Sequence, residues 1–204
     1  ETPQEEDNWI AAMEWADSLG VDVTSTSLGY LDWDPPFTSY SWEDMDGNTT
    51  VITKAADRAA AVGILVCNSA GNEGDGSWYY IGAPADGDSV FTIGAVDING
   101  NSVSFSSHGP TFDGRLKPNI VGQGAGTGVV TSNGTVAYGN GTSYSSPLIA
   151  GACASFMSAF PELSNMEVMD IIQSTASQAD NTDNSMGYGI PNFAKAHLEL
   201  KGID

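Results

Sequence analysis

A serine at the start of an apolar helix is the feature of this sequence with the clearest chemical meaning. Residues 141–147 read Gly-Thr-Ser-Tyr-Ser-Ser-Pro and lead into an apolar segment that runs to Pro161. The pattern predicts a helix with Pro147 in its first turn, where the missing N–H of proline has no intrahelical partner to lose. Ser143 then lies among unpaired N–H groups at the positive end of the helix dipole. Its hydroxyl could be a nucleophile beside an anion site, or simply an N-terminal helix cap.

Three further motifs occur in the chain. Ser-Ala-Gly-Asn-Glu-Gly occupies residues 69–74, Thr-Ser-Leu-Gly occupies 26–29, and Ser-Phe-Ser-Ser-His-Gly-Pro occupies 104–110, followed by Arg-Leu-Lys-Pro at 115–118. Together with the serine segment, their order and approximate spacing resemble those of the subtilisin-like serine peptidases, the subtilases. The resemblance extends over essentially the whole chain.

The resemblance implies a role for each motif. Ser143 would be the acyl-forming nucleophile, and Asn72 would donate its side-chain N–H to the oxyanion beside the backbone N–H of Ser143. Taken alone, Asn72 is also typical of an Asn-Glu-Gly turn. An extended substrate could bind by adding a strand against two short segments of small residues. The residues of those substrate-binding walls would be Ser27, Leu28, Gly29, Ser69, Ala70 and Gly71.

Two members of the family's catalytic triad have no counterpart in this sequence. In the subtilases the catalytic Asp and His precede the cleft strand, whereas the only histidines here are His108 and His197. Residues 1–204 are therefore expected to be one partial, N-terminally truncated peptidase domain that is inactive alone. His108 falls at a position that the family uses structurally, and no local carboxylate orients it as a base. The alternative is a non-catalytic pseudo-peptidase or peptide-binding module.

Apolar periodicity predicts alternating helices and strands. Helices are expected at residues 7–19, 49–61 and 192–200, and from the capping box at 164–167 to about 176. Strands are expected at 21–26, 64–68 and 90–96. Two further strands, at 129–131 and 135–138, are expected to form a hairpin. Residues 28–48 are too irregular to assign, and the glycine-rich residues 122–128 are interpreted as backbone entry to the serine loop. The alternation indicates an α/β fold with a parallel sheet, and the resemblance implies three layers. The motifs then gather beyond the carboxyl ends of the strands.

Composition excludes some classes of partner. The chain has 6 basic and 26 acidic residues, a formal net charge of −20, which argues against binding to nucleic acid or anionic membranes. No apolar run is long enough for membrane insertion. The expected partners are a peptide or protein substrate, the missing N-terminal part of the same domain, and a second copy paired through the exposed truncated edge. Secretion or a cell-envelope location is the family expectation.

Cysteines and acidic turns lead to two smaller predictions. Cys67 and Cys153 lie in apolar surroundings and are expected to be free core thiols. No cofactor is required, although relatives often bind calcium as a structural ion. The acidic segments 32–34, 44–48 and 97–101 do not fit a calcium-loop pattern, and turn formation is favoured for them.

Overall fold

Four parallel strands form the central layer of the molecule, which a computed structural model describes over residues 1–203. The strands are β1 (Val23–Thr26), β2 (Leu65–Ser69), β3 (Phe91–Val96) and β4 (Ile120–Gln123), and they lie side by side in that order. Thr26 pairs with Asn68 in the register of β1 and β2. The residues that follow these two strands therefore emerge at the same edge of the sheet.

Both faces of the sheet are apolar. Every residue of β2 and β3 is buried, as expected of parallel strands covered on both sides. Leu65 and Cys67 pack into one hydrophobic cluster, whereas Val66, which points the opposite way, packs into another. The sheet thus separates two cores.

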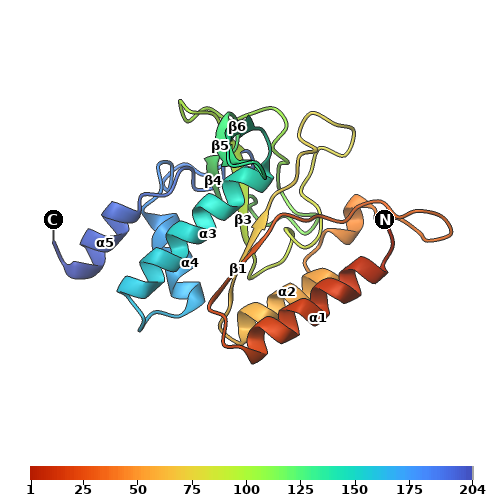
Figure 1. Ribbon diagram of the computed structural model, residues 1–204, viewed down its shortest axis with the longest axis horizontal. Helices are drawn as coiled ribbons and strands as arrows, with labels where there is room; N and C mark the ends of the chain where they lie inside the picture. Colours follow the sequence, from red (N-terminus) through yellow and green to blue (C-terminus); the bar gives the residue numbers. More distant parts are fainter. Residues whose placement is uncertain (204) are drawn as a thin grey trace.

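Helices cover both faces and complete a three-layer α/β arrangement (Figure 1). On one face, α3 (Thr142–Ala159) contacts all four strands, and α4 (Asn165–Ser174) and α5 (Phe193–Lys201) pack with it. On the other face, α1 (Gln4–Ser18) and α2 (Val51–Ala61) pack together. A 3-10 turn, η1 (Trp42–Asp44), lies in the connection between β1 and α2. Within residues 1–203, no helix combines the length and apolar character needed to cross a bilayer.

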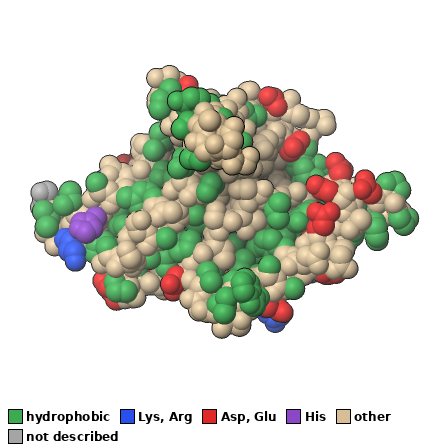
Figure 2. All heavy atoms as spheres, in the orientation of Figure 1, with side chains coloured by type: hydrophobic (Ala, Val, Ile, Leu, Met, Phe, Trp, Pro, Cys, Tyr) green, Lys and Arg blue, Asp and Glu red, His purple; other side chains and the backbone are tan. Residues whose placement is uncertain are grey.

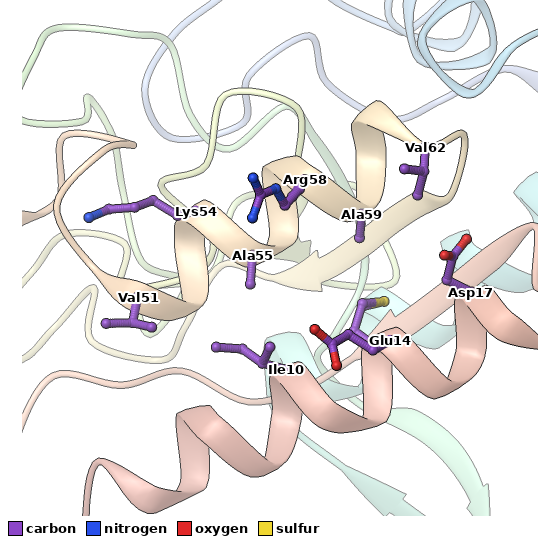
Figure 3. Close-up of a pocket in the computed structure, with 10 residues that line it drawn as sticks. Ile10, Glu14, Asp17, Val51, Lys54, Ala55, Arg58, Ala59 and Val62 are labelled. Atoms are coloured by element: carbon purple, nitrogen blue, oxygen red, sulfur yellow. The ribbon is translucent and has the colours of Figure 1, made fainter.

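A groove of about 740 Å³ runs between α1 and α2 (Figure 3). Its walls carry Glu14 and Asp17 from α1 and Lys54 and Arg58 from α2. None of its lining residues belongs to the motifs described above.

An antiparallel hairpin precedes α3. It consists of β5 (Thr127–Val130) and β6 (Val136–Gly139), and its turn contains Asn133 and Gly134, a dipeptide typical of tight hairpins. The hairpin forms the protrusion at the top of Figure 2, where hydrophobic side chains gather. The same view shows acidic side chains concentrated toward the end of the molecule that carries the N-terminus.

Most expected elements agree with the structure, with ends that differ by a few residues. The capping box at Ser164 and Glu167 starts α4, and Asn192 caps α5. The interpretation of residues 122–128 is wrong in part, because 122–123 belong to β4 and 127–128 to β5. β4 has only four residues, and the sequence pattern of its glycine and the preceding Pro118 is typical of a loop.

Cys67 and Cys153 are both free and buried, which confirms the prediction of two core thiols. They come from β2 and α3 and pack in the same cluster. Hydrogen bonding to Cys153 and burial raise the pKa of the Cys67 thiol, so the neutral form is favoured. The pair therefore packs as apolar core between sheet and helix.

Candidate active site

All eight residues that the motifs single out line one pocket of about 150 Å³ at the carboxyl edge of the sheet. The eight are Ser27, Leu28, Gly29, Ser69, Ala70, Gly71, Asn72 and Ser143. They come from the end of β1, the end of β2 with the loop after it, and the start of α3. Their chemical roles stay predictions, but the fold brings all of them to one place.

The nucleophile candidate Ser143 is half-buried in the first turn of α3. The helix begins at Thr142, so the prediction that Pro147 lies in the first turn is wrong. Proline has no N–H to donate to the carbonyl four residues earlier, which is that of Ser143. The Ser27 hydroxyl donates to this carbonyl at 3.3 Å instead. This bond joins the end of β1 to the start of α3.

Thr142 orients the side-chain amide of Asn72. The backbone N–H of Thr142 donates to Asn72 Oδ1 at 2.9 Å, and the Thr142 hydroxyl lies 3.1 Å from the same oxygen. Because an N–H must face an acceptor, this contact assigns Oδ1 to the Thr142 side and Nδ2 to the other side. Among residues 1–203, Asn72 Nδ2 donates no hydrogen bond within the protein, so its two hydrogens are free for a ligand.

The start of α3 adds further attraction for negative charge. The backbone N–H of Ser143 belongs to the first turn, where N–H groups have no intrahelical acceptor. The helix dipole places partial positive charge at the same end. An anionic oxygen held near the Ser143 hydroxyl could therefore receive hydrogen bonds from Asn72 and from the backbone.

Neither histidine of the described chain lines this pocket. His108 stacks on Tyr79 with ring centroids 4.5 Å apart, and burial lowers its pKa. Its backbone N–H donates to the Tyr79 carbonyl, and its own carbonyl accepts from Ile81. His197 packs its ring 5.0 Å from that of Phe160, the residue that follows α3. His108 is thus held by contacts with residues 79–81, outside the lining of the pocket.

Two of the three acidic segments, 44–48 and 97–101, contain turns, whereas residues 32–34 are irregular. Asp46 accepts hydrogen bonds from the backbone of Asn48 and Thr49, and Asp97 accepts from Asn99 and Asn101. The bonds from Asn101 are the main reason that the pKa of Asp97 is lowered. In the part of the chain that the structure describes, no three His, Cys, Asp or Glu side chains converge to hold a metal ion.

Four further residues line the pocket, and motif analysis assigned none of them to it: Leu31, Glu73, Gly82 and Ser107. Ser107 had a signal, since it lies in the motif at 104–110, and its hydroxyl accepts from the Glu73 N–H at 3.0 Å. Leu31 lies in the unassigned segment 28–48. Gly82 meets it only because Tyr30 and Ala83 pair across two loops distant in sequence. No local sequence pattern predicts a contact of this kind.

Comparison with known proteins gives one consistent result. A family model described as Peptidase_S8, the subtilase family, matches residues 2–189. Subtilisin DY from Bacillus licheniformis is 36% identical over 181 residues, covering 88% of this chain and 57% of the relative. Subtilisin E from Bacillus subtilis (strain 168) is 34% identical over 177 residues, covering 86% of this chain and 41% of the relative. The chain spans about half the length of the curated relatives that it matches.

Solved structures agree on the fold. The prenylagaramide maturation protease PagA superposes with a TM-score of 0.75 at 22% identity, covering 98% of this chain and 69% of that one. MycP1 with its N-terminal propeptide removed also superposes with a TM-score of 0.75, at 21% identity, covering 96% of this chain and 67% of that one. The three-layer parallel-sheet architecture is therefore that of these proteases.

Proposed function

Because this chain belongs to the subtilase family, we propose that it supplies the nucleophile and the oxyanion site of a subtilisin-type serine endopeptidase. The observation that carries the proposal is the convergence of Ser143 and Asn72 on one pocket. The substrate is an extended peptide or protein segment whose backbone lies along residues 27–29 and 69–71 as an added strand. The small side chains of these segments permit close approach.

In the proposed reaction, Ser143 Oγ attacks the carbonyl carbon of the scissile peptide bond, and its proton passes to a general base. The carbonyl oxygen gains negative charge and accepts hydrogen bonds from Asn72 Nδ2 and from the Ser143 N–H. Collapse of the tetrahedral intermediate breaks the C–N bond, and the leaving amine takes the proton from the base. Water then releases the acyl group and restores the hydroxyl.

We assign the general base to a histidine, with its orienting aspartate, from polypeptide outside these 204 residues. The support is that neither His108 nor His197 lines the pocket within the described chain. Without a base, the Ser143 hydroxyl stays protonated and reacts slowly. Removing the triad histidine from an enzyme of this family costs about 10⁶ in turnover.

A fluorophosphonate probe, which reacts with activated serine hydroxyls, tests this assignment. It is applied to the product of the whole reading frame that encodes these residues and to the 204-residue chain. We expect rapid labelling of the former, slow labelling of the latter, and loss of labelling in Ser143→Ala. Ser145→Ala is the matched control, because that hydroxyl donates to the Thr142 carbonyl at 3.0 Å instead of lining the pocket. Rapid Ser143-dependent labelling of the 204-residue chain would mean that the base lies within it.

Replacing Asn72 with alanine tests the oxyanion role separately. In the product of the whole reading frame, turnover of a peptide substrate should fall by about 10²–10³. This is the loss known for removing one such donor from an enzyme of this family. The fall should appear in kcat with little change in KM, since the donor acts on the transition state.

A second candidate function is that of a non-catalytic peptide-binding module. Its support is that binding a peptide along residues 27–29 and 69–71 needs no base, so the described pocket is sufficient for it. If the product of the whole reading frame binds peptides at this cleft but neither labels nor hydrolyses them, this second function holds and the catalytic one fails.

The edge of the sheet suggests where additional polypeptide binds. β1 is an edge strand, and its Thr24 hydroxyl is buried without a hydrogen-bond partner in the described chain. We propose that the part of the domain carrying the base pairs there, and that the 204-residue chain dimerises through this edge when alone. Light scattering at increasing protein concentration measures the dimer. Secretion or cell-envelope residence, and an optional structural calcium ion, belong to the same proposal.

A further inference from the structure

The pocket beside Ser143 is closed at one end by Leu31. We propose that Leu31 restricts this pocket to short, uncharged side chains, so that the residue contributing the scissile carbonyl is one such as alanine. This inference rests on the proposed function, because it concerns the substrate of the same site.

Leu31 fills the space that Gly82 would otherwise leave open. A Cβ built on Gly82 would lie 2.6 Å from Leu31 Cδ2 and 3.3 Å from its Cγ, so the leucine side chain sits directly over the glycine. Both residues line the pocket. The end of the pocket is therefore occupied by a side chain from the segment that follows β1.

The backbone around Leu31 is fixed on both sides. The Tyr30 N–H donates to the Ala83 carbonyl at 2.8 Å, and the Tyr40 N–H donates to the Leu31 carbonyl at 2.8 Å. Tyr30 also stacks on Trp33 with ring centroids 5.2 Å apart. These contacts fix the backbone of Leu31, so the folded loop keeps the leucine side chain next to Gly82.

The volume sets the size of side chain that fits. The pocket measures about 150 Å³, and a cavity of about that size is filled by one benzene molecule. Here the same space must also hold the substrate carbonyl between Ser143 and Asn72. An aromatic side chain does not fit beside that carbonyl, whereas a methyl group does.

Glu73 also lines the pocket, and a carboxylate there could attract a basic substrate side chain, but its orientation does not favour this. Its Oε2 lies 3.3 Å from the position of a Cβ on Gly76, so the carboxylate turns back toward its own loop. Leu28 and Leu31 are the largest apolar side chains that line the pocket. A lysine side chain would be buried against these apolar groups without a close partner for its ammonium.

The test measures binding, so that it does not depend on a base. Acetylated tetrapeptides that differ only in their C-terminal alanine, phenylalanine or lysine are titrated into the isotope-labelled 204-residue chain, and Kd is taken from NMR shifts. We expect the alanine peptide to bind most tightly. In Leu31→Ala, the ratio of the phenylalanine Kd to the alanine Kd should fall by about tenfold or more, as for added room in an apolar pocket. Leu31→Val should shift the ratio in the same direction by less.

Phe37→Ala is the matched control, because Phe37 lies in the same loop, is exposed and does not line the pocket. It should leave the ratio unchanged. Tighter binding of the phenylalanine or lysine peptide to the wild-type chain, or an unchanged ratio in Leu31→Ala, would overturn the inference alone. If no peptide binds and the Asn72 and Ser143 signals do not shift, the proposed function fails, and the inference with it.

Discussion

Replacing Thr142 with alanine tests whether this residue orients the Asn72 amide. The Thr142 side chain is fully buried between the loop after β2 and the start of α3. Its hydroxyl accepts from the Gly71 N–H at 3.3 Å and lies within hydrogen-bonding distance of the Gly71 carbonyl and of Asn72 Oδ1. Alanine removes these contacts but keeps the backbone N–H that donates to Asn72.

The expected loss of stability follows from the group left without a partner. The part-buried N–H of Gly71 loses its acceptor, and leaving such a group unpaired costs about 1–3 kcal/mol. For a chain of this size, each kcal/mol lowers Tm by about 2–4 °C. Thr142→Ala should therefore unfold about 2–12 °C below the wild type. Asn72, held by one hydrogen bond instead of two, should sample more than one orientation.

Calorimetry measures the first effect, and the side-chain amide signals of Asn72 in NMR spectra measure the second. Thr142→Ser should restore both, because it keeps the hydroxyl. Thr175→Ala is the control for losing a buried threonine hydroxyl elsewhere, since Thr175 follows the last residue of α4 and donates to the Ile171 carbonyl. It should leave the Asn72 signals unchanged. Wild-type Tm and unchanged Asn72 signals in Thr142→Ala would refute the reasoning.

Three further predictions concern stability. Burial lowers the pKa of Lys117 to about 7, so between about pH 7 and 10 the unfolded chain binds a proton that the folded chain does not. The free energy of unfolding should therefore rise with pH across that window. Urea titrations at several pH values measure this slope, which Lys117→Met should flatten. Gly71→Ala should lower the free energy of unfolding by about 1–3 kcal/mol, because φ is +106° and the new Cβ would lie 2.8 Å from the Ser107 hydroxyl. Gly151→Ala should raise it by about 0.5–1 kcal/mol, because Gly151 lies inside α3 with open space around it. Cys67 and Cys153 should resist a thiol reagent in the native state and both react in urea, and immediate native labelling would contradict their burial.

The sequence was sufficient to predict that the candidate residues lie together, because its motifs fall at the ends of strongly patterned elements. The apolar run before Asn72 and the apolar helix after Ser143 predict their own positions, and parallel connection places both at the carboxyl edge. Asn72 and Ser143 accordingly line one pocket.

The contacts that refine the site could not be predicted. β4 depends on pairing with β3, since four residues with a glycine carry too little local preference for a strand. The contact of Leu31 with Gly82 and the bond from Ser27 to the Ser143 carbonyl join residues far apart in sequence. Such contacts are fixed by tertiary packing and leave no periodic signal.

The place of α3 along the polypeptide has a consequence for biosynthesis. All four strands of the sheet precede residue 124, but the helix that covers one of their faces ends only at Ala159. At ribosomal speeds of about 5–20 residues per second, the apolar face waits about 2–7 s for its cover. During that interval the candidate site is incomplete, and the uncovered face of the sheet exposes apolar side chains to solvent.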